Sequence, residues 1–100
     1  MFNVETEQDG RKATVRPAGM LNARTASEFQ TRLAEVPADV NEVVLDCAKL
    51  RYTSSAGLRV ILALQTRMDK CHGSLVITNI NSVLRETFND TGFSEFLTIE

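Results

Sequence analysis

Residues 43–70 read VVLDCAKLRYTSSAGLRVILALQTRMDK, and this stretch decides the fold. Val43-Val44-Leu45 is a short β-branched run, which suits a strand that is covered on both faces. We expect that strand to end near Asp46 and to pass through a polar turn into a helix from Ser55 to Lys70. The helix carries one broad apolar stripe, formed by Leu58, Val60, Ile61, Leu62, Leu64 and Met68. A stripe this wide predicts a helix that lies flat on a sheet.

Upstream, the chain predicts a hairpin and a first helix. Apolar and polar residues alternate on both sides of Asp9-Gly10, a dipeptide that suits a tight turn, so we expect an antiparallel hairpin over about residues 2–18. Thr25 and Glu28 fit a capping box, which predicts that the helix begins there. Pro37 is expected to end it.

Downstream, the pattern predicts a buried strand at residues 75–77, a third helix from Ser82 to Thr91 and a weak strand at residues 97–99. Gly92 is placed where a left-handed residue would close the third helix. Strands that alternate with helices indicate parallel pairing with the helices packed on the sheet. We therefore predict one α/β domain over residues 1–100, with a mixed four- to five-stranded sheet, an N-terminal antiparallel hairpin and three main helices.

The composition excludes several classes of function. Eleven Lys and Arg against thirteen Asp and Glu give a net charge of −2, which argues against a nucleic-acid-binding protein. No stretch approaches the roughly 18 apolar residues of a membrane helix, so we expect no direct membrane insertion. The N-terminus lacks the pattern of a secretion signal, and the chain has two cysteines. We therefore expect a cytoplasmic protein with reduced thiols.

The residues do not predict an enzyme. The single histidine, His72, lies at the far end of the predicted helix from Ser55, roughly 25 Å away, so a Ser–His pair cannot form within the chain. Cys47, Cys71 and His72 lack the spacing of a metal site, and the thiols are expected to fill the core. His72 is expected to be solvated. No glycine-rich phosphate loop is present. We predict no catalytic residue, metal or cofactor.

The start of the 55–70 helix carries the one unusual constellation. Ser54 or Ser55 is suited to cap the helix, which contributes about 1 kcal/mol. Gly57 in the first turn costs up to about 1 kcal/mol relative to alanine, so something must favour the missing side chain. With Ala56 it predicts a flat surface that another molecule can approach closely. A serine at a helix N-terminus also suits a phosphate.

These residues resemble a known family. Leu45-Asp46, Leu50, Tyr52 and the run from Ser54 to Leu62 are similar to the signature of the STAS domain (sulphate transporter and anti-sigma factor antagonist). Residues 19–26, GMLNARTA, resemble that family's second motif, the loop that enters the first helix. Residues 83–93 fit its C-terminal part. The resemblance covers nearly the whole chain and implies a STAS fold.

A free-standing chain this short most resembles the bacterial anti-sigma factor antagonists. In that group a serine at this position is phosphorylated by a partner that is both serine kinase and anti-sigma factor. The unphosphorylated form binds the partner, the phosphorylated form releases it, and a serine phosphatase resets the switch. The resemblance implies Ser55 as the acceptor, with Ser54 as the alternative.

The resemblance also implies a set of partner-binding residues: Asn22, Ala23, Arg24, Thr25, Thr53, Ser54, Ala56, Gly57 and Arg59. Arg24 and Arg59 fit solvated surface charges equally well. Many family members have Asp where this chain has Asn22 and Ser54, so this site carries less negative charge.

Two other functions remain open. The domain could be a STAS subunit of a membrane transport complex that binds its partner without phosphorylation, in which case Ser55 is only a helix cap. It could also be a STAS module that binds a small molecule or nucleotide, although it lacks a phosphate loop. A kinase or phosphatase gene beside this one favours the switch, and transporter genes favour the subunit.

Overall fold

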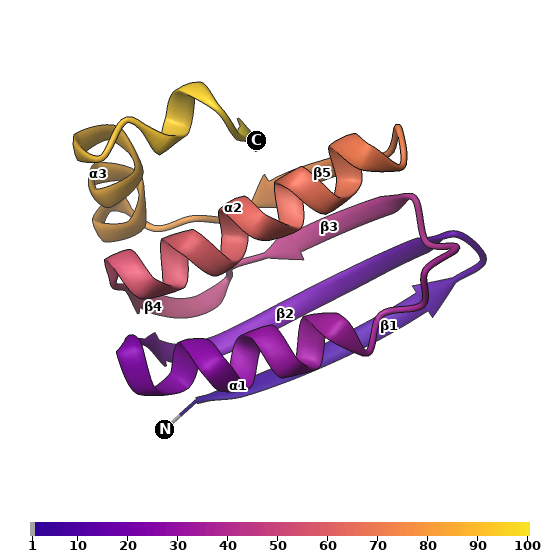
Figure 1. The fold of residues 1–100 in the computed structure, drawn as a ribbon. Coiled ribbons are helices and arrows are strands. Elements are labelled where there is room, and N and C mark those ends of the chain that lie inside the picture. The colour runs from indigo at the N-terminus through magenta and orange to yellow at the C-terminus, as the bar shows by residue number, and fades with distance from the viewer. Residues whose placement is uncertain (1) are drawn as a thin grey trace.

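A computed structural model describes residues 2–100 and shows a mixed sheet with helices laid across it (Figure 1). The strands are β1 (Asn3–Asp9), β2 (Lys12–Leu21), β3 (Glu42–Asp46), β4 (Lys49–Thr53), β5 (Ser74–Thr78) and β6 (Thr98–Ile99). The helices are α1 (Ala23–Ala34), α2 (Ser55–Lys70), α3 (Ser82–Asp90) and the short 3₁₀ helix η1 (Phe93–Glu95). None of these helices is long and apolar enough to cross a membrane.

Strand β2 organises the sheet. It pairs antiparallel with β1 and parallel with both β3 and β4. Residues 12–15 of β2 pair with β3, whereas residues 18–21 pair with β4, and the register shifts between Gly19 and Met20. Strands β3 and β4 therefore follow one another along the same edge of β2. The sheet continues in parallel from β3 to β5 and β6.

The predicted architecture is confirmed, but the sheet contains one strand more than predicted. Strand β4 occupies most of the segment that we expected to be a polar turn after Asp46. In β4, Leu50 and Thr53 are buried and the two residues between them are exposed. A strand with one wet face is normally recognised by strict alternation. The buried residues of β4 are three positions apart, so the sequence pattern did not identify this strand.

Helices α1 and α2 lie side by side on one face of the sheet (Figure 1), and the core fills the space beneath them. Its largest fully buried side chains include Phe29 from α1, Ile61 and Met68 from α2, and Leu45 and Ile77 from the strands. Burial of such side chains from water is the dominant favourable contribution to folding. Leu62 differs from our expectation, because it is 37% exposed and turns away from the buried stripe of α2.

The helix ends follow local hydrogen bonding. The bounds of α2 are those predicted, and Gly92 after α3 has the expected left-handed φ of 78°. The capping box of α1 was predicted one turn too late. Asn22 caps the helix and Thr25 is its third residue, so the box is Asn22–Thr25 and α1 begins at Ala23. Asn is as good a cap as Thr, and it comes first along the chain.

Arg67 ties α2 to the end of α1. Its guanidinium donates hydrogen bonds to the carbonyl oxygens of Leu33 at 3.0 Å, Val36 at 2.8 Å and Pro37 at 3.1 Å. The last carbonyls of a helix have no partner within that helix, and a cation there also complements the helix dipole. Leu33 belongs to the last turn of α1, and Val36 and Pro37 belong to the segment that follows it. Arg67 therefore joins α2 to the last turn of α1 and to that segment.

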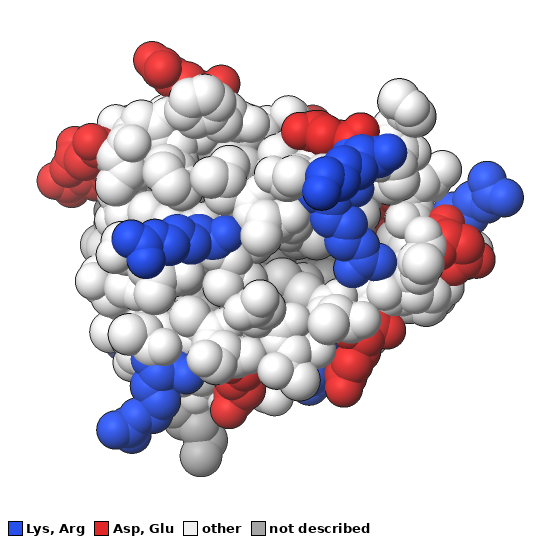
Figure 2. Space-filling view, viewed as in Figure 1, with Lys and Arg blue, Asp and Glu red and all other residues white. Residues whose placement is uncertain are grey.

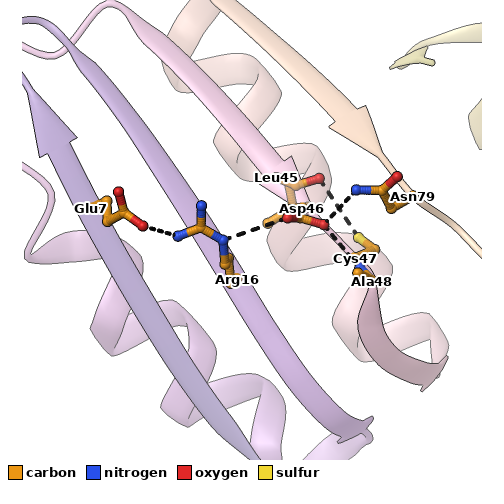
Figure 3. Close-up of polar contacts among 7 residues, drawn as sticks. All are labelled: Glu7, Arg16, Leu45, Asp46, Cys47, Ala48 and Asn79. Atoms are coloured by element: carbon orange, nitrogen blue, oxygen red, sulfur yellow. Dashed lines mark hydrogen bonds and ion pairs between the residues drawn. The ribbon is translucent and has the colours of Figure 1, made fainter.

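A polar network fixes the step between β3 and β4 (Figure 3). Asp46 Oδ1 accepts hydrogen bonds from the backbone N–H of Ala48 at 3.1 Å and from Asn79 Nδ2 at 2.9 Å. Its Oδ2 lies 3.5 Å from Arg16 Nε, and Arg16 also pairs with Glu7. The bond from Asn79 is the largest cause of the lowered pKa of Asp46, while burial opposes it. The network thus links β1, β2 and β3 to the end of β5.

Candidate functional site

The N-terminal ends of α1 and α2 lie next to each other. Strand β2 ends at Leu21, directly before α1, and β4 ends at Thr53, directly before α2. Leu21 and Thr53 are register partners, and the backbone N–H of Ser54 donates to Leu21 O at 2.7 Å. Because the carboxyl ends of paired parallel strands meet at one edge of a sheet, the two helix starts form a single surface. We refer to Asn22–Thr25 with Ser54–Arg59 as the helix-start surface.

The Asn22 loop is held by its own side chains. Asn22 Oδ1 accepts from the backbone N–H groups of Arg24 and Thr25, both at 3.0 Å. Thr25 Oγ1 accepts from the backbone N–H of Asn22 at 2.8 Å and donates to Met20 O at 2.9 Å. These bonds satisfy N–H groups that would otherwise lack partners at the helix start. The loop is therefore pre-ordered rather than shaped by a partner.

Ser54 and Ser55 have different roles in the structure. Ser54 is the N-cap of α2: it is half-buried, and its Oγ accepts from Gly57 N at 3.4 Å. Ser55 is the first residue of the helix and is exposed. The hydroxyl of Ser54 is thus engaged in capping, while the side chain of Ser55 faces solvent. This arrangement favours Ser55 as the group that a visiting enzyme can reach.

Gly57 is required by packing within the domain. A Cβ atom added there would lie 2.3 Å from Thr53 Oγ1 and 2.6 Å from Leu21 Cγ, closer than real Cβ atoms approach. The missing side chain lets the first turn of α2 sit directly on β2 and β4. Gly57 is buried, so it does not form the flat exposed patch that we expected from the sequence. Ala56 beside it is partly exposed.

The residues predicted to bind a partner fall into two groups. Eight of the nine residues lie at the two helix starts, and Asn22, Ala23, Arg24 and Arg59 are exposed. Thr53 is only 1% exposed, and Gly57 is also buried. A partner cannot touch these two without rearrangement. Thr53 and Gly57 are therefore corrected from contact residues to residues that support the surface from beneath.

The helix-start surface has an unbalanced charge. Neither α1 nor α2 has an acidic residue in its first turn. The ion pairs among residues 2–100 are Glu7–Arg16, Arg16–Asp46 and Arg32–Glu35, so Arg24 and Arg59 are left without a carboxylate partner. Figure 2 shows basic side chains at its left, over the helix starts, with no acidic atoms between them. Helix N-termini and free cations together favour an anion at this surface.

The cysteines and the histidine lie away from this surface. Cys47 is buried, as expected, and burial raises the pKa of its thiol to about 12, with the charge of Asp46 as a smaller cause. Cys71 is exposed at the end of α2, which corrects our expectation that both thiols fill the core. His72 is exposed just after α2, as expected. Among residues 2–100, no cluster of His, Cys, Asp or Glu is suited to hold a metal ion.

Known proteins resemble this chain in sequence and in structure. The family model described as the STAS domain matches residues 3–100. A relative from Bordetella bronchiseptica, named "Putative anti-sigma factor antagonist BtrV", is 37% identical over 76 residues, which are 75% of this chain and 66% of that protein.

Two solved structures share the fold. An anti-sigma factor antagonist from Mycobacterium paratuberculosis has a TM-score of 0.87 at 19% identity and covers 99% of this chain and 85% of its own. The Bacillus cell fate determinant SpoIIAA in its phosphorylated form has a TM-score of 0.74 at 15% identity, covering 100% and 91%. The match of the family model to nearly the whole sequence agrees with the shared fold. This chain belongs to the STAS domain family.

Proposed function

We propose that this protein is an anti-sigma factor antagonist whose binding is switched by phosphorylation of Ser55. In its unphosphorylated form it sequesters an anti-sigma factor that is also a serine kinase, and this frees the sigma factor. The kinase phosphorylates Ser55 and is released, and a serine phosphatase restores the binding form. The protein acts in the cytoplasm as a binding module, with no catalytic residue or cofactor of its own.

The observation that carries this proposal is that two adjacent serines have different environments. Ser54 caps α2 through its hydroxyl, whereas Ser55 presents its side chain to solvent. A kinase needs an accessible hydroxyl, and a phosphatase needs to reach the resulting phosphate. Ser55 meets both needs without any loss of the cap. Modification of Ser54 would remove a bond that holds the first turn of the helix.

The local charges explain why a phosphate would act on the interface and leave the fold intact. A phosphate on Ser55 adds about −1.5 to −2 charge at a helix N-terminus, where free N–H groups stabilise it. The first turn of α2 holds no acidic residue that would repel it. A partner that covers Ser55 would have to enclose the dianion. Without added cations this costs several kcal/mol, which is on the order of a hundred-fold or more in affinity.

The names of related proteins support the same function. The relative from Bordetella bronchiseptica is named an anti-sigma factor antagonist, and so is the Mycobacterium paratuberculosis protein. SpoIIAA has been solved in an unphosphorylated and a phosphorylated form, and each has a TM-score of 0.74 with this chain. A related fold thus exists with and without a phosphate. This supports a switch that acts through charge and not through refolding.

The test is phosphorylation by the serine kinase encoded nearest to this gene. The purified protein is incubated with that kinase and ATP, its intact mass is measured, and the modified residue is mapped. We expect one added phosphate on Ser55, which is absent in Ser55→Ala and retained in Ser54→Ala. Phosphate on Ser54 alone would reassign the acceptor. No modification, together with stable binding to a transport protein, would replace the switch with the transport-subunit function.

A further inference from the structure

The surface between α1 and α2 is a groove that runs along both helices. Two adjoining hollows between the helices have volumes of about 310 and 160 Å³. A third hollow of about 610 Å³, lined by α2 and Cys71 alone, continues them toward the C-terminal end of α2. Ala63 lines all three hollows and so lies at the middle of the groove. Figure 2 shows this face of the molecule with a depression at its centre. Helix α1, with 12 residues, makes the groove about 18 Å long.

The α1 side of the groove is small and uncharged. Ala23, Ser27, Gln30 and Ala34 line it and are exposed. Their spacing of four, three and four residues places them in one row along the helix. Three of the four side chains are small. How closely two helices approach depends on the size of the side chains at the contact, so this row admits a third helix at short range.

The α2 side of the groove is positively charged. Its charged lining residues are Arg59, Arg67 and Lys70, and no Asp or Glu lines any of the three hollows. Arg67 is occupied by the carbonyls at the end of α1. Arg59 and Lys70 are exposed, and neither forms an ion pair with the described residues. In a chain with a net charge of −2, a groove lined by cations alone favours an acidic occupant.

We propose that this groove seats an acidic amphipathic helix of the anti-sigma partner, an inference that rests on the function proposed above. The apolar face of that helix packs on the exposed Ala34 and Ala63. Leu33 and Val60, which are 6% and 9% exposed, form the floor of the groove beneath them.

The carboxylates of the partner helix meet Arg59 and Lys70. These two residues are eleven positions apart on α2, or about 16 Å along the axis. The partner helix therefore needs acidic residues about eleven positions apart, which is close to three turns and puts them on one face.

The groove continues into the surface that carries Ser55. Ala56 and Arg59 line its first hollow and belong to the opening turns of α2. Ser55 and Arg59 are four positions apart, so they lie on the same face of the helix. A phosphate on Ser55 would stand at the entrance of the groove and oppose the positive charge that attracts the partner. Phosphorylation of Ser55 should therefore weaken the binding of an acidic helix in the groove.

The experiment maps binding onto the ¹⁵N-labelled full chain by chemical-shift perturbation. Two probes are used: the anti-sigma factor encoded nearest to this gene, and a synthetic helical peptide with two Glu residues eleven positions apart. A peptide with Lys at the same two positions is the control. We expect the anti-sigma factor and the Glu peptide to shift the backbone amide of Ala63 and its neighbours in the groove, and the Lys peptide to leave them unchanged.

Variants of one groove position separate charge from size. Ala63→Glu should weaken binding of the anti-sigma factor by about tenfold or more, because it adds an acid to the groove floor. Ala63→Gln has nearly the same size and should cost distinctly less. Removing both cations, in Arg59→Gln with Lys70→Gln, should weaken binding by about tenfold and reduce its salt dependence. Lys12→Gln on the hairpin is the control and should bind as the unmodified protein does.

The outcomes distinguish this inference from the proposed function. If the anti-sigma factor binds and Ser55 phosphorylation releases it, but the groove variants bind within about twofold, the groove is not the docking site and the switch stands. If no anti-sigma factor binds but the Glu peptide shifts the groove amides, the proposed function fails and the occupant is not an anti-sigma factor, whereas the preference of the groove for an acidic helix stands. If neither probe shifts these amides, the groove inference is wrong.

Discussion

Two polar regions of this domain differ in whether their charged side chains are paired. Around Asp46, where β3 ends, the three charged side chains of Glu7, Arg16 and Asp46 pair with one another, and Asn79 also donates to Asp46. At the starts of α1 and α2, Arg24 and Arg59 have none among residues 2–100, and the side chain of Ser55 is exposed. Paired groups fix the position of the backbone, whereas unpaired ones remain available to another molecule. The first region holds the strands in place, and the second is the candidate site.

The largest effect is expected from a charge at Ser55. Ser55→Asp should fold normally and lose binding to the anti-sigma factor by on the order of a hundred-fold, because the partner must enclose the carboxylate. Ser55→Ala should bind without regulation. Titration calorimetry measures both affinities, and Ser82→Asp, at the first residue of α3, is the matched control. Normal binding by Ser55→Asp would argue against exclusion by charge.

A substitution beneath the site should act on stability instead of charge. Gly57→Ala places a methyl group 2.3 Å from Thr53 Oγ1, so the side chains of Thr53 and Leu21 or the start of α2 have to shift. Overpacking of this kind costs about 1–3 kcal/mol. Urea unfolding should show the loss, and Ala56→Gly in the same turn should cost at most about 1 kcal/mol. An unchanged midpoint for Gly57→Ala would mean that the helix start adapts freely.

The link between α1 and α2 should contribute a comparable amount to the free energy of unfolding. Arg67→Ala removes three hydrogen bonds to the last turn of α1 and the segment after it, which we expect to cost about 1.5–3 kcal/mol of the free energy of unfolding. Arg59→Ala, on the same helix but unpaired, should stay within about 0.5 kcal/mol. Thermal and urea unfolding compare the two. Equal losses would mean that helix propensity, and not the capping of α1, decides the effect.

The smallest effect is expected from Asp46, and it depends on pH. Because the folded state holds the pKa of Asp46 below its ordinary value of 3.8, this group stabilises the fold above that value. The contribution is lost as the pH falls through the lowered folded-state pKa. Asp46→Asn should cost about 1 kcal/mol at neutral pH and nothing below the folded-state pKa. A constant difference between the two proteins from neutral to strongly acidic pH would contradict this assignment.

The sequence predicted the elements whose signals are local. Helix α2 was placed at its observed bounds because a serine pair and an apolar stripe lie within one continuous segment. Gly92 was recognised because a left-handed turn after a helix has a preferred residue. Strand β4 was missed because Arg51 and Tyr52, which are adjacent, are both exposed. Two adjacent exposed residues interrupt the alternation of buried and exposed positions by which a strand is identified.

The site was predicted in part for the same reason. The two serines and the Asn22 loop stand out in the sequence, and so does the cost of Gly57 in a helix. The explanation for Gly57 is a contact with Leu21, which is thirty-six positions earlier and belongs to another strand. The groove also depends on how α1 and α2 lie relative to each other. Contacts between distant segments leave no periodic pattern in the sequence, so these features require the folded structure.

Because β3 and β4 pair with the same edge of β2, the short link at Cys47-Ala48 sets the position of β4 along β2. It therefore also sets the position of the helix-start surface. Strand β3 is anchored farther back along β2, and β4 carries α2 at its far end. One residue more or less in this link would slide β4 along β2 by about 3.3 Å and would turn its side chains to the other side. The position of Ser55 relative to Asn22 would then shift along the direction of β2, although the hairpin and β3 would stay in place. In relatives whose link has another length, the two helix starts should therefore be offset differently, and these proteins should select different partners.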